Sequence, residues 1–246
     1  EAVRVAQQRR ATSLLLSTPA AASRVAIGIP SRVHVRLVSP GIDERTWVPA
    51  SDDRGEQTQD VLFLANLTPR KGVLVLLDAF AEVARALPSA RLLVAGDGPL
   101  RAEVQRRAQG SERVELLGAV ERSRALTLMQ ECAVYCSPSL GEPFGMTALE
   151  AMACAKPVVA TDSGGLRHLV PGQGGRKVPA GDPAALAAAL LGLLPDAETR
   201  RAMGEHNRRT VEERYAWGRV ADALEDAYQE ALSGSRTPPG GLSSNR

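Results

Sequence analysis

Residues 137–156 read SPSLGEPFGMTALEAMACAK and join a short apolar run, 133–136, to an amphipathic stretch. The run has the length and composition of a buried strand, and residues 145–154 have the spacing of a helix. Glu142 precedes Pro143, and a residue before proline disfavours helical backbone, so we expect this glutamate on the intervening loop. A strand that ends in a loop and opens a helix is the repeating unit of parallel α/β sheets.

The start of this expected helix has the features of an anion site. Free N–H groups at Gly145, Met146 and Thr147 combine with the helix dipole to attract a phosphate, and Thr147 adds a hydroxyl. Glu150 follows Thr147 by three positions, so both side chains share one face, where a carboxylate can accept hydrogen bonds from a ribose diol. With Glu142 on the loop, these groups suit a phosphorylated sugar; the alternative is an ordinary loop–helix junction with solvated glutamates.

Outward from this stretch, short apolar runs alternate with helical spacing. The expected strands cover residues 61–65, 91–95, 114–117, 133–136, 157–160 and, briefly, 177–178. The expected helices cover residues 72–87, 99–108, 122–131, 145–154 and 183–194. This alternation predicts right-handed βαβ units in a Rossmann-like parallel sheet with helices on both faces, an α/β fold whose ligands bind at the carboxyl ends of the strands.

The rest of the chain divides around this domain, which we place at residues 61–195. Residues 1–45 hold a short βαβ pattern, with strands at 13–16 and 33–38 and a helix at 19–27. Polar, breaker-rich residues make 46–60 a linker that we expect to be loop. Residues 196–232 have helical character throughout, and 233–246 form a disordered tail.

Composition limits the function classes. Of 246 residues, 44% are hydrophobic and 3% aromatic, which predicts a core of Ala, Val and Leu and excludes global disorder. A net charge of +2, with only three lysines among 30 basic residues, gives no broad field for nucleic acid. The three cysteines fit no zinc pattern, so we expect buried thiols in a reducing, cytoplasmic compartment. No apolar run is long enough to span a membrane, and no signal peptide is visible. The sequence lacks an initiator Met, which suggests processing, truncation or trimming.

Three further stretches follow expected strands. In 66–72, NLTPRKG, the adjacent Arg70 and Lys71 can neutralise a diphosphate, the alternative being a solvated basic loop. Residues 94–99, VAGDGP, resemble a dinucleotide fingerprint, but Arg101 replaces the third glycine, so a tight turn near a ligand is preferred over a nicotinamide site. Residues 161–165, TDSGG, either contact a ligand or turn the chain.

Taken in order, these segments resemble the C-terminal half of a retaining GT-B glycosyltransferase of the family 4 type, which uses nucleotide-sugar donors. The matching segments are SPGID at 39–43, LFLANLTPRKGVLVLLDAFAEV at 62–83, LLVAGDGP at 92–99, VELLGAV at 114–120 and SPSLGEPFGMTALEAMACAKPVVATDSGG at 137–165. Glu142 and Glu150 form the family's E-x7-E pair. Asn66 departs from the family's usual glycine, and Pro40 stands where many members have asparagine.

The resemblance implies a role for each residue of the site. Glu150 would hold the donor ribose and Thr147 the phosphate, while Glu142 and the backbone of Phe144, Gly145 and Met146 would contact the donor sugar. Arg70 and Lys71 would bind the diphosphate and stabilise the leaving nucleotide, which makes Glu142, Arg70 and Lys71 the expected catalytic group. The remaining expected donor contacts are Asn66, Gly96 and Leu117.

The resemblance also implies the chain's partners. It predicts hexosyl transfer from a UDP- or GDP-sugar to an unknown acceptor (a glycan, a lipid or a small molecule) with no metal cofactor. Residues 1–45 would be the remnant of an N-terminal Rossmann domain that is otherwise absent. A partner domain or a second copy would then cover the open donor face, and the alternative is a non-catalytic nucleotide-sugar-binding half.

Overall fold

The fold is seen in a computed structural model, which describes residues 13–16, 34–52 and 54–233. Its main feature is a parallel sheet of six strands in the order β5-β4-β3-β6-β7-β8. The strands are β3 (Asp60–Leu64), β4 (Arg91–Ala95), β5 (Val114–Gly118), β6 (Val134–Ser137), β7 (Val158–Thr161) and β8 (Gly175–Val178). Every strand expected between residues 61 and 178 is therefore present, within about two residues at each end.

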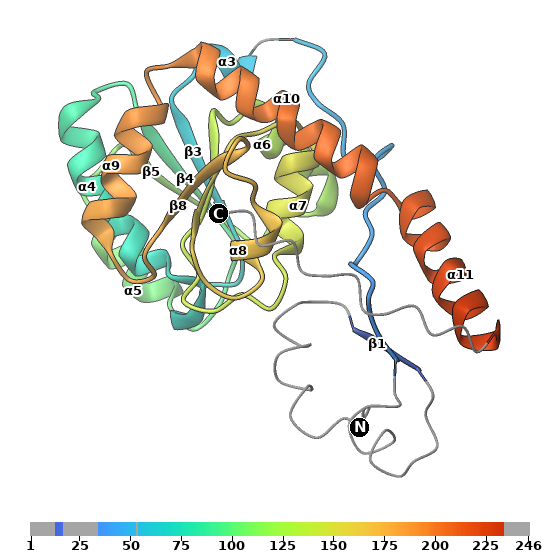
Figure 1. Cartoon of the computed structure of the whole chain (residues 1–246). Coiled ribbons are helices and arrows are strands. Elements are labelled where there is room, and N and C mark those ends of the chain that lie inside the picture. The colour runs from blue at the N-terminus through green and yellow to red at the C-terminus, as the bar shows by residue number, and fades with distance from the viewer. Residues whose placement is uncertain (1–12, 17–33, 53, 234–246) are drawn as a thin grey trace. The chain divides into compact units, whose positions relative to one another are not determined.

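Helices cover both faces of this sheet (Figure 1). On one face lie α4 (Val73–Ala86), α5 (Arg101–Ala108) and α9 (Pro183–Leu193). On the other face lie α6 (Arg122–Glu131) and α7 (Met146–Ala153), while the short α8 (Leu166–Leu169) joins β7 to β8. The predicted Rossmann-like α/β architecture is confirmed.

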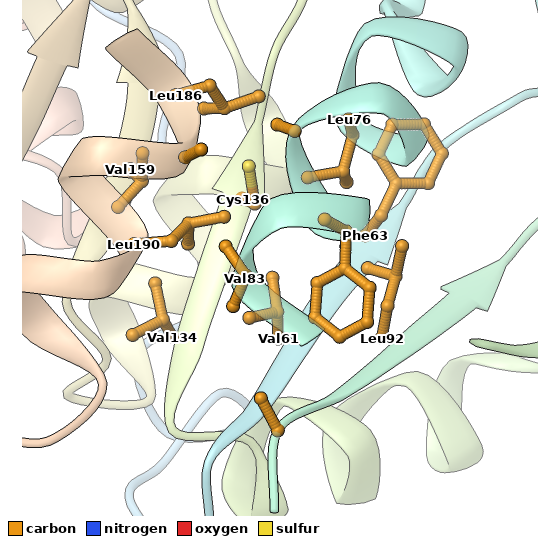
Figure 2. Packing of buried hydrophobic residues seen from close by; sticks show 14 of the residues in the cluster. Val61, Phe63, Leu76, Val83, Leu92, Val134, Cys136, Val159, Leu186 and Leu190 are labelled. Carbon is orange, nitrogen blue, oxygen red and sulfur yellow. The ribbon is translucent and has the colours of Figure 1, made fainter. Parts of the chain in front are cut away.

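The core between the sheet and the α4–α9 layer is mainly aliphatic, as the low aromatic content predicts (Figure 2). Val61 and Phe63 alternate along β3, and Val134 and Cys136 repeat this pattern on β6. Burying such side chains stabilises the fold by roughly 1.5–3 kcal/mol each. The three cysteines, Cys132, Cys136 and Cys154, are buried and unpaired, as expected.

The strand order has one reversal, between β3 and β6. The chain runs from β3 outward to β4 and β5, crosses back to β6 beside β3, and continues outward to β7 and β8. At such a switch point the loops after the two central strands diverge, and the crevice between them is where open α/β sheets bind ligands. The loops after β3 and β6 are the two stretches with the strongest chemical signal in the sequence.

The chain divides into two compact units: 42–213, which holds this sheet, and 1–41 together with 214–246. In the second unit, β1 (Ser13–Leu16) pairs in parallel with β2 (His34–Leu37), and Arg36 forms an ion pair with Glu230 of α11 (Trp217–Ser233). The helix expected at 19–27 lies outside the described residues. The predicted limits at 45, 60, 195 and 232 stay predictions.

The expected loop 46–60 needs one correction, because it contains a short helix, α3 (Arg54–Gln57). Tertiary contact overrides the breaker-rich sequence there: Arg200 of α10 (Ala197–Arg214) donates through Nη2 to the carbonyl oxygen of Glu56, at 2.6 Å. No helix among the described residues is both long and apolar enough to cross a membrane.

Candidate functional site

The loops after β3 and β6 meet at the switch point. Lys71 donates through Nζ to Oε2 of Glu142, at 2.5 Å, and the two side chains are 19% and 12% exposed. Arg70 donates through Nη1 to the carbonyl oxygen of Gly141, at 2.8 Å, and its own carbonyl accepts from the N–H of Leu140, also at 2.8 Å. The three residues predicted as a catalytic group, Arg70, Lys71 and Glu142, are therefore brought together.

A close backbone approach fixes the spacing of these two loops. Gly72 has φ +73°, and a Cβ there would lie 2.0 Å from the carbonyl oxygen of Pro138. Only glycine combines a left-handed backbone with room for such an approach. Gly72 thus sets how near Arg70 and Lys71 lie to the loop that carries Glu142.

The β7–α8 segment supports the Glu142 loop from the other side. The hydroxyls of Thr161 and Ser163 both donate to the carbonyl oxygen of Ser139, at 2.5 and 3.0 Å. Ser139 in turn donates through Oγ to Glu142, at 3.4 Å, and the N–H of Gly165 donates to the carbonyl of Glu142, at 2.6 Å. The sequence left two interpretations of residues 161–165, ligand contact or a turn, and the structure adds a third. These residues hold the loop that carries Glu142.

The first turn of α7 opens directly after that loop. Gly145 is its N-cap, with φ +107°, and it has no side chain that could cap the helix, so no side chain in the described part of the chain accepts from the N-cap position. Met146 is 40% exposed and Thr147 is half-buried. A helix therefore begins where the sequence predicted one, and Phe144 lies half-buried just before it. Anion binding at this helix start stays a prediction.

Glu150 lies one turn further along α7 and is half-buried. Burial raises the pKa of its carboxyl group to about 7, and the nearby Arg122 acts in the opposite direction. Arg122 begins α6, and its guanidinium lies 5.7 Å from the ring centroid of the buried Trp47. Arg122 was not predicted as a site residue, although a cation that begins a helix shortly after a strand of this sheet was a usable signal.

The other three predicted donor contacts lie at the same edge of the sheet. Asn66 is exposed at the end of β3, and Leu117 is half-buried near the end of β5. Gly96 follows β4 with φ +138°, where a Cβ would lie 1.9 Å from the carbonyl oxygen of Ala65. Its N–H donates to Gly118, at 2.6 Å, so Gly96 forms the tight turn that the sequence favoured. Ligand contact by these three residues stays a prediction.

Known proteins are similar to this chain in sequence and in architecture. The family described as "Glycosyl transferases group 1" matches residues 58–196. The chain is 36% identical over 218 residues to the phosphatidyl-myo-inositol mannosyltransferase of Mycobacterium leprae, covering 86% of this chain and 55% of that protein. It is 34% identical over 234 residues to the D-inositol 3-phosphate glycosyltransferase of Salinispora tropica, covering 85% and 48%.

Solved structures agree on the fold. The sucrose-phosphate synthase of Thermosynechococcus elongatus superposes with a TM-score of 0.78 at 27% identity, over 95% of this chain and 62% of that one. Anabaena HepE, solved in complex with UDP and glucose, superposes with a TM-score of 0.75 at 24% identity, over 95% and 67%. This chain spans about half the length of the curated relatives it matches. It carries the C-terminal half of a GT-B fold and belongs to the glycosyl transferases group 1 family.

Proposed function

We propose that this chain is the donor-binding part of a retaining glycosyltransferase of the family 4 type, which transfers a hexosyl group from a UDP- or GDP-sugar to an acceptor. One observation carries the proposal: Arg70, Lys71 and Glu142 converge at the β3–β6 switch point. The UDP bound by HepE, a protein of the same fold, supports a nucleotide donor.

The diphosphate is assigned to the cations and the helix start. Arg70 is exposed and Lys71 half-buried, so both can turn a charged group toward a ligand in the crevice. A doubly charged diphosphate matches these two cations. The N–H of Met146 and the hydroxyl of Thr147 add hydrogen bonds at the positive end of α7. As the bond to the sugar breaks, negative charge grows on the leaving diphosphate, and fixed cations stabilise that charge.

The sugars are assigned to the two glutamates. Glu150, one turn into α7, would accept hydrogen bonds from the ribose hydroxyls. Glu142 now pairs with Lys71 at 2.5 Å. When the diphosphate attracts Lys71, Glu142 gains a free lone pair for a donor-sugar hydroxyl, beside the backbone of Phe144 and Gly145. Donor binding would thus exchange one ion pair for two.

The remaining assignments follow from the same site. Charge neutralisation by Arg70, Lys71 and the helix start needs no metal in the donor site. Three unpaired buried thiols fit a reducing, cytoplasmic compartment. The acceptor would bind on a further domain or a second copy that covers the donor face.

A second candidate function is a nucleotide-sugar-binding half without activity of its own. The residues brought together at the switch point, Arg70, Lys71 and Glu142, are all assigned to the donor, and this observation favours the second candidate. A donor-hydrolysis assay separates the two, because sustained turnover by the purified chain contradicts a purely binding role.

Calorimetric titration with UDP, GDP, UDP-glucose and GDP-mannose tests the donor site. We expect one nucleotide series to bind, and the double variant R70A/K71A to weaken that binding at least about tenfold through the loss of two charge-assisted contacts. Arg85, on the exposed side of α4, gives the matched control R85A, which should bind like the parent chain. No binding at millimolar nucleotide, or equal losses in both variants, would reject the assignment.

A further inference from the structure

A cavity of about 370 Å³ lies at the amino ends of the strands, where β6 and β7 begin, opposite the loops that carry the donor site. Ala133 precedes β6 and Pro157 precedes β7, and both line the cavity together with residues of α10. Its volume is within the range of small-molecule sites, roughly 300–1,000 Å³. Because the donor site is at the carboxyl ends of the strands, the proposed function does not use this cavity.

The cavity walls carry more positive than negative charge. The cations that line it are Lys156, Arg200, Arg201, Arg208 and Arg209. The carboxylates that line it are Asp52, Glu56 and Glu205. Among the described residues of the lining the cations outnumber the carboxylates by two, which favours an anionic ligand.

Lys156 is a buried cation that has no carboxylate partner among the described residues. It is 8% exposed, and its Nζ donates to the carbonyl oxygen of Gln130 at 2.7 Å. A Cβ at Gly55 would lie 2.2 Å from this Nζ, so the ammonium is held directly beneath the α3 backbone. Within the described part of the chain, Lys156 forms no ion pair. A carbonyl dipole satisfies one of its three N–H donors but does not balance its charge.

Arg200 repeats this arrangement. It is 4% exposed and donates only to main-chain carbonyls among the described residues, including those of Leu193 at 3.3 Å and Glu56 at 2.6 Å. Its buried Nε has no hydrogen-bond partner in that part of the chain. Among the described residues neither cation forms an ion pair, although Asp196 and Glu56 act on Arg200 at longer range. Such an arrangement is unusual because buried charges are normally paired.

The rim offers two arginines that can move. Arg201 and Arg209 are exposed on α10, one turn on either side of Glu205. Arg208, by contrast, is committed to Glu212 at 2.6 Å and to the carbonyls of Trp47 and Ala153, at 2.8 and 2.9 Å. A ligand would therefore meet two guanidinium groups that form no ion pair within the described residues, and two buried cations behind them.

From this arrangement we propose that the cavity binds a small phosphate dianion, either free phosphate or a phosphate monoester such as a hexose phosphate. Guanidinium forks match phosphate oxygens in pairs, which makes Arg201 and Arg209 the residues that recognise the ligand. Lys156 and Arg200 supply the charge at the back of the cavity. The site is an effector site, separate from the donor site, although Cys154 and Ala155 in its wall follow the end of the helix that begins at the donor site.

The experiment must silence the donor site, because free phosphate could also bind there. We would titrate the full chain carrying R70A/K71A with inorganic phosphate and with glucose 6-phosphate in a calorimeter. We expect binding of at least one ligand in this background, weakened at least about tenfold when R201A/R209A is added. The control is R176A, a surface arginine of β8. It should leave binding unchanged.

The outcomes separate the two proposals. Tighter binding of glucose 6-phosphate than of phosphate identifies a monoester ligand, and equal binding identifies phosphate itself. Absence of binding in the R70A/K71A background, or binding that R201A/R209A leaves intact while both variants keep the parent's thermal unfolding midpoint, overturns the proposal. A UDP titration of R201A/R209A measures nucleotide binding at the donor site independently of the cavity. Either proposal can therefore be rejected while the other stands.

Discussion

Lys71 and Glu142 lie 71 positions apart in the sequence, yet their side chains form an ion pair of 2.5 Å between the loops after β3 and β6. The pair links the two strands that flank the switch point, where the fold places its ligand crevice. Both residues were predicted as contacts to a donor, and the structure also places them in contact with each other.

Removal of one partner of this pair should destabilise the fold. Lys71→Met or Glu142→Gln leaves a largely buried charge or acceptor unpaired, and we expect a loss of about 2 kcal/mol, below the roughly 3–5 kcal/mol of fully buried pairs. Urea unfolding measures it. The double variant should lose less than the sum of the singles, and strict additivity would show that the two groups do not interact. Lys177→Met, on the exposed side of β8, should change stability by less than about 0.5 kcal/mol.

Thr161→Val should weaken binding of the sugar more than binding of the nucleotide. The substitution removes one of two hydroxyl donors to the Ser139 carbonyl, at a cost of about 1 kcal/mol, and loosens the loop that carries Glu142. Affinity for the sugar nucleotide should therefore fall while affinity for the free nucleotide changes little. Thr127→Val, which removes an exposed hydroxyl from α6, is the control. Equal losses for both ligands would contradict a positioning role.

Gly72→Ala should cost more than Gly110→Ala, although both glycines have a left-handed backbone. Their φ angles are +73° and +82°, but a Cβ at Gly110 meets nothing within 4 Å, whereas one at Gly72 meets the Pro138 carbonyl at 2.0 Å. The shared strain is about 1–2 kcal/mol, and the clash adds roughly 1–3 kcal/mol. Thermal unfolding compares the two variants. Equal shifts would mean that the loops separate freely, and then nucleotide affinity should also be unchanged.

Donor affinity should rise with pH across neutrality. The pKa of Glu150 is about 7 because burial favours its neutral form, so the carboxyl's contribution to folding is full below its unfolded pKa and is lost as pH rises through about 7. Ribose binding needs the ionised form, so affinity for UDP-glucose, whose diphosphate does not titrate in this range, should increase about tenfold between about pH 6 and about pH 8. Glu150→Gln should bind with no such slope; a parallel slope in the variant would assign the titration elsewhere.

The order of strands and helices could be predicted because most strands of the sheet hold a short apolar run bounded by turn residues, as at residues 92–95. The charged residues at strand ends could also be placed, since parallel strands share one carboxyl edge. Their pairing could not: whether Lys71 points at a ligand or at Glu142 depends on the distance between two loops, which Gly72 and Pro138 set.

Contacts between distant elements account for what the sequence analysis missed. Thr161 and Ser163 read as turn residues, and only the neighbouring β6 loop gives their hydroxyls an acceptor. The helix α3 and the cation-lined cavity both depend on contacts with arginines of α10. The helical periodicity of the sequence does not identify the residues that these arginines contact. The local sequence pattern predicts helices and strands, whereas these contacts depend on which distant segments of the chain pack together.

A crystal structure of the chain with UDP or GDP bound would test the assignment of the donor site to the start of α7. We expect the diphosphate at the start of α7, within hydrogen-bond distance of Arg70 or Lys71 and of the Met146 or Thr147 N–H group, with the ribose hydroxyls on Glu150. Nucleotide bound at any other edge of the sheet, or bound at this edge with Glu150 and both cations out of contact, would contradict it.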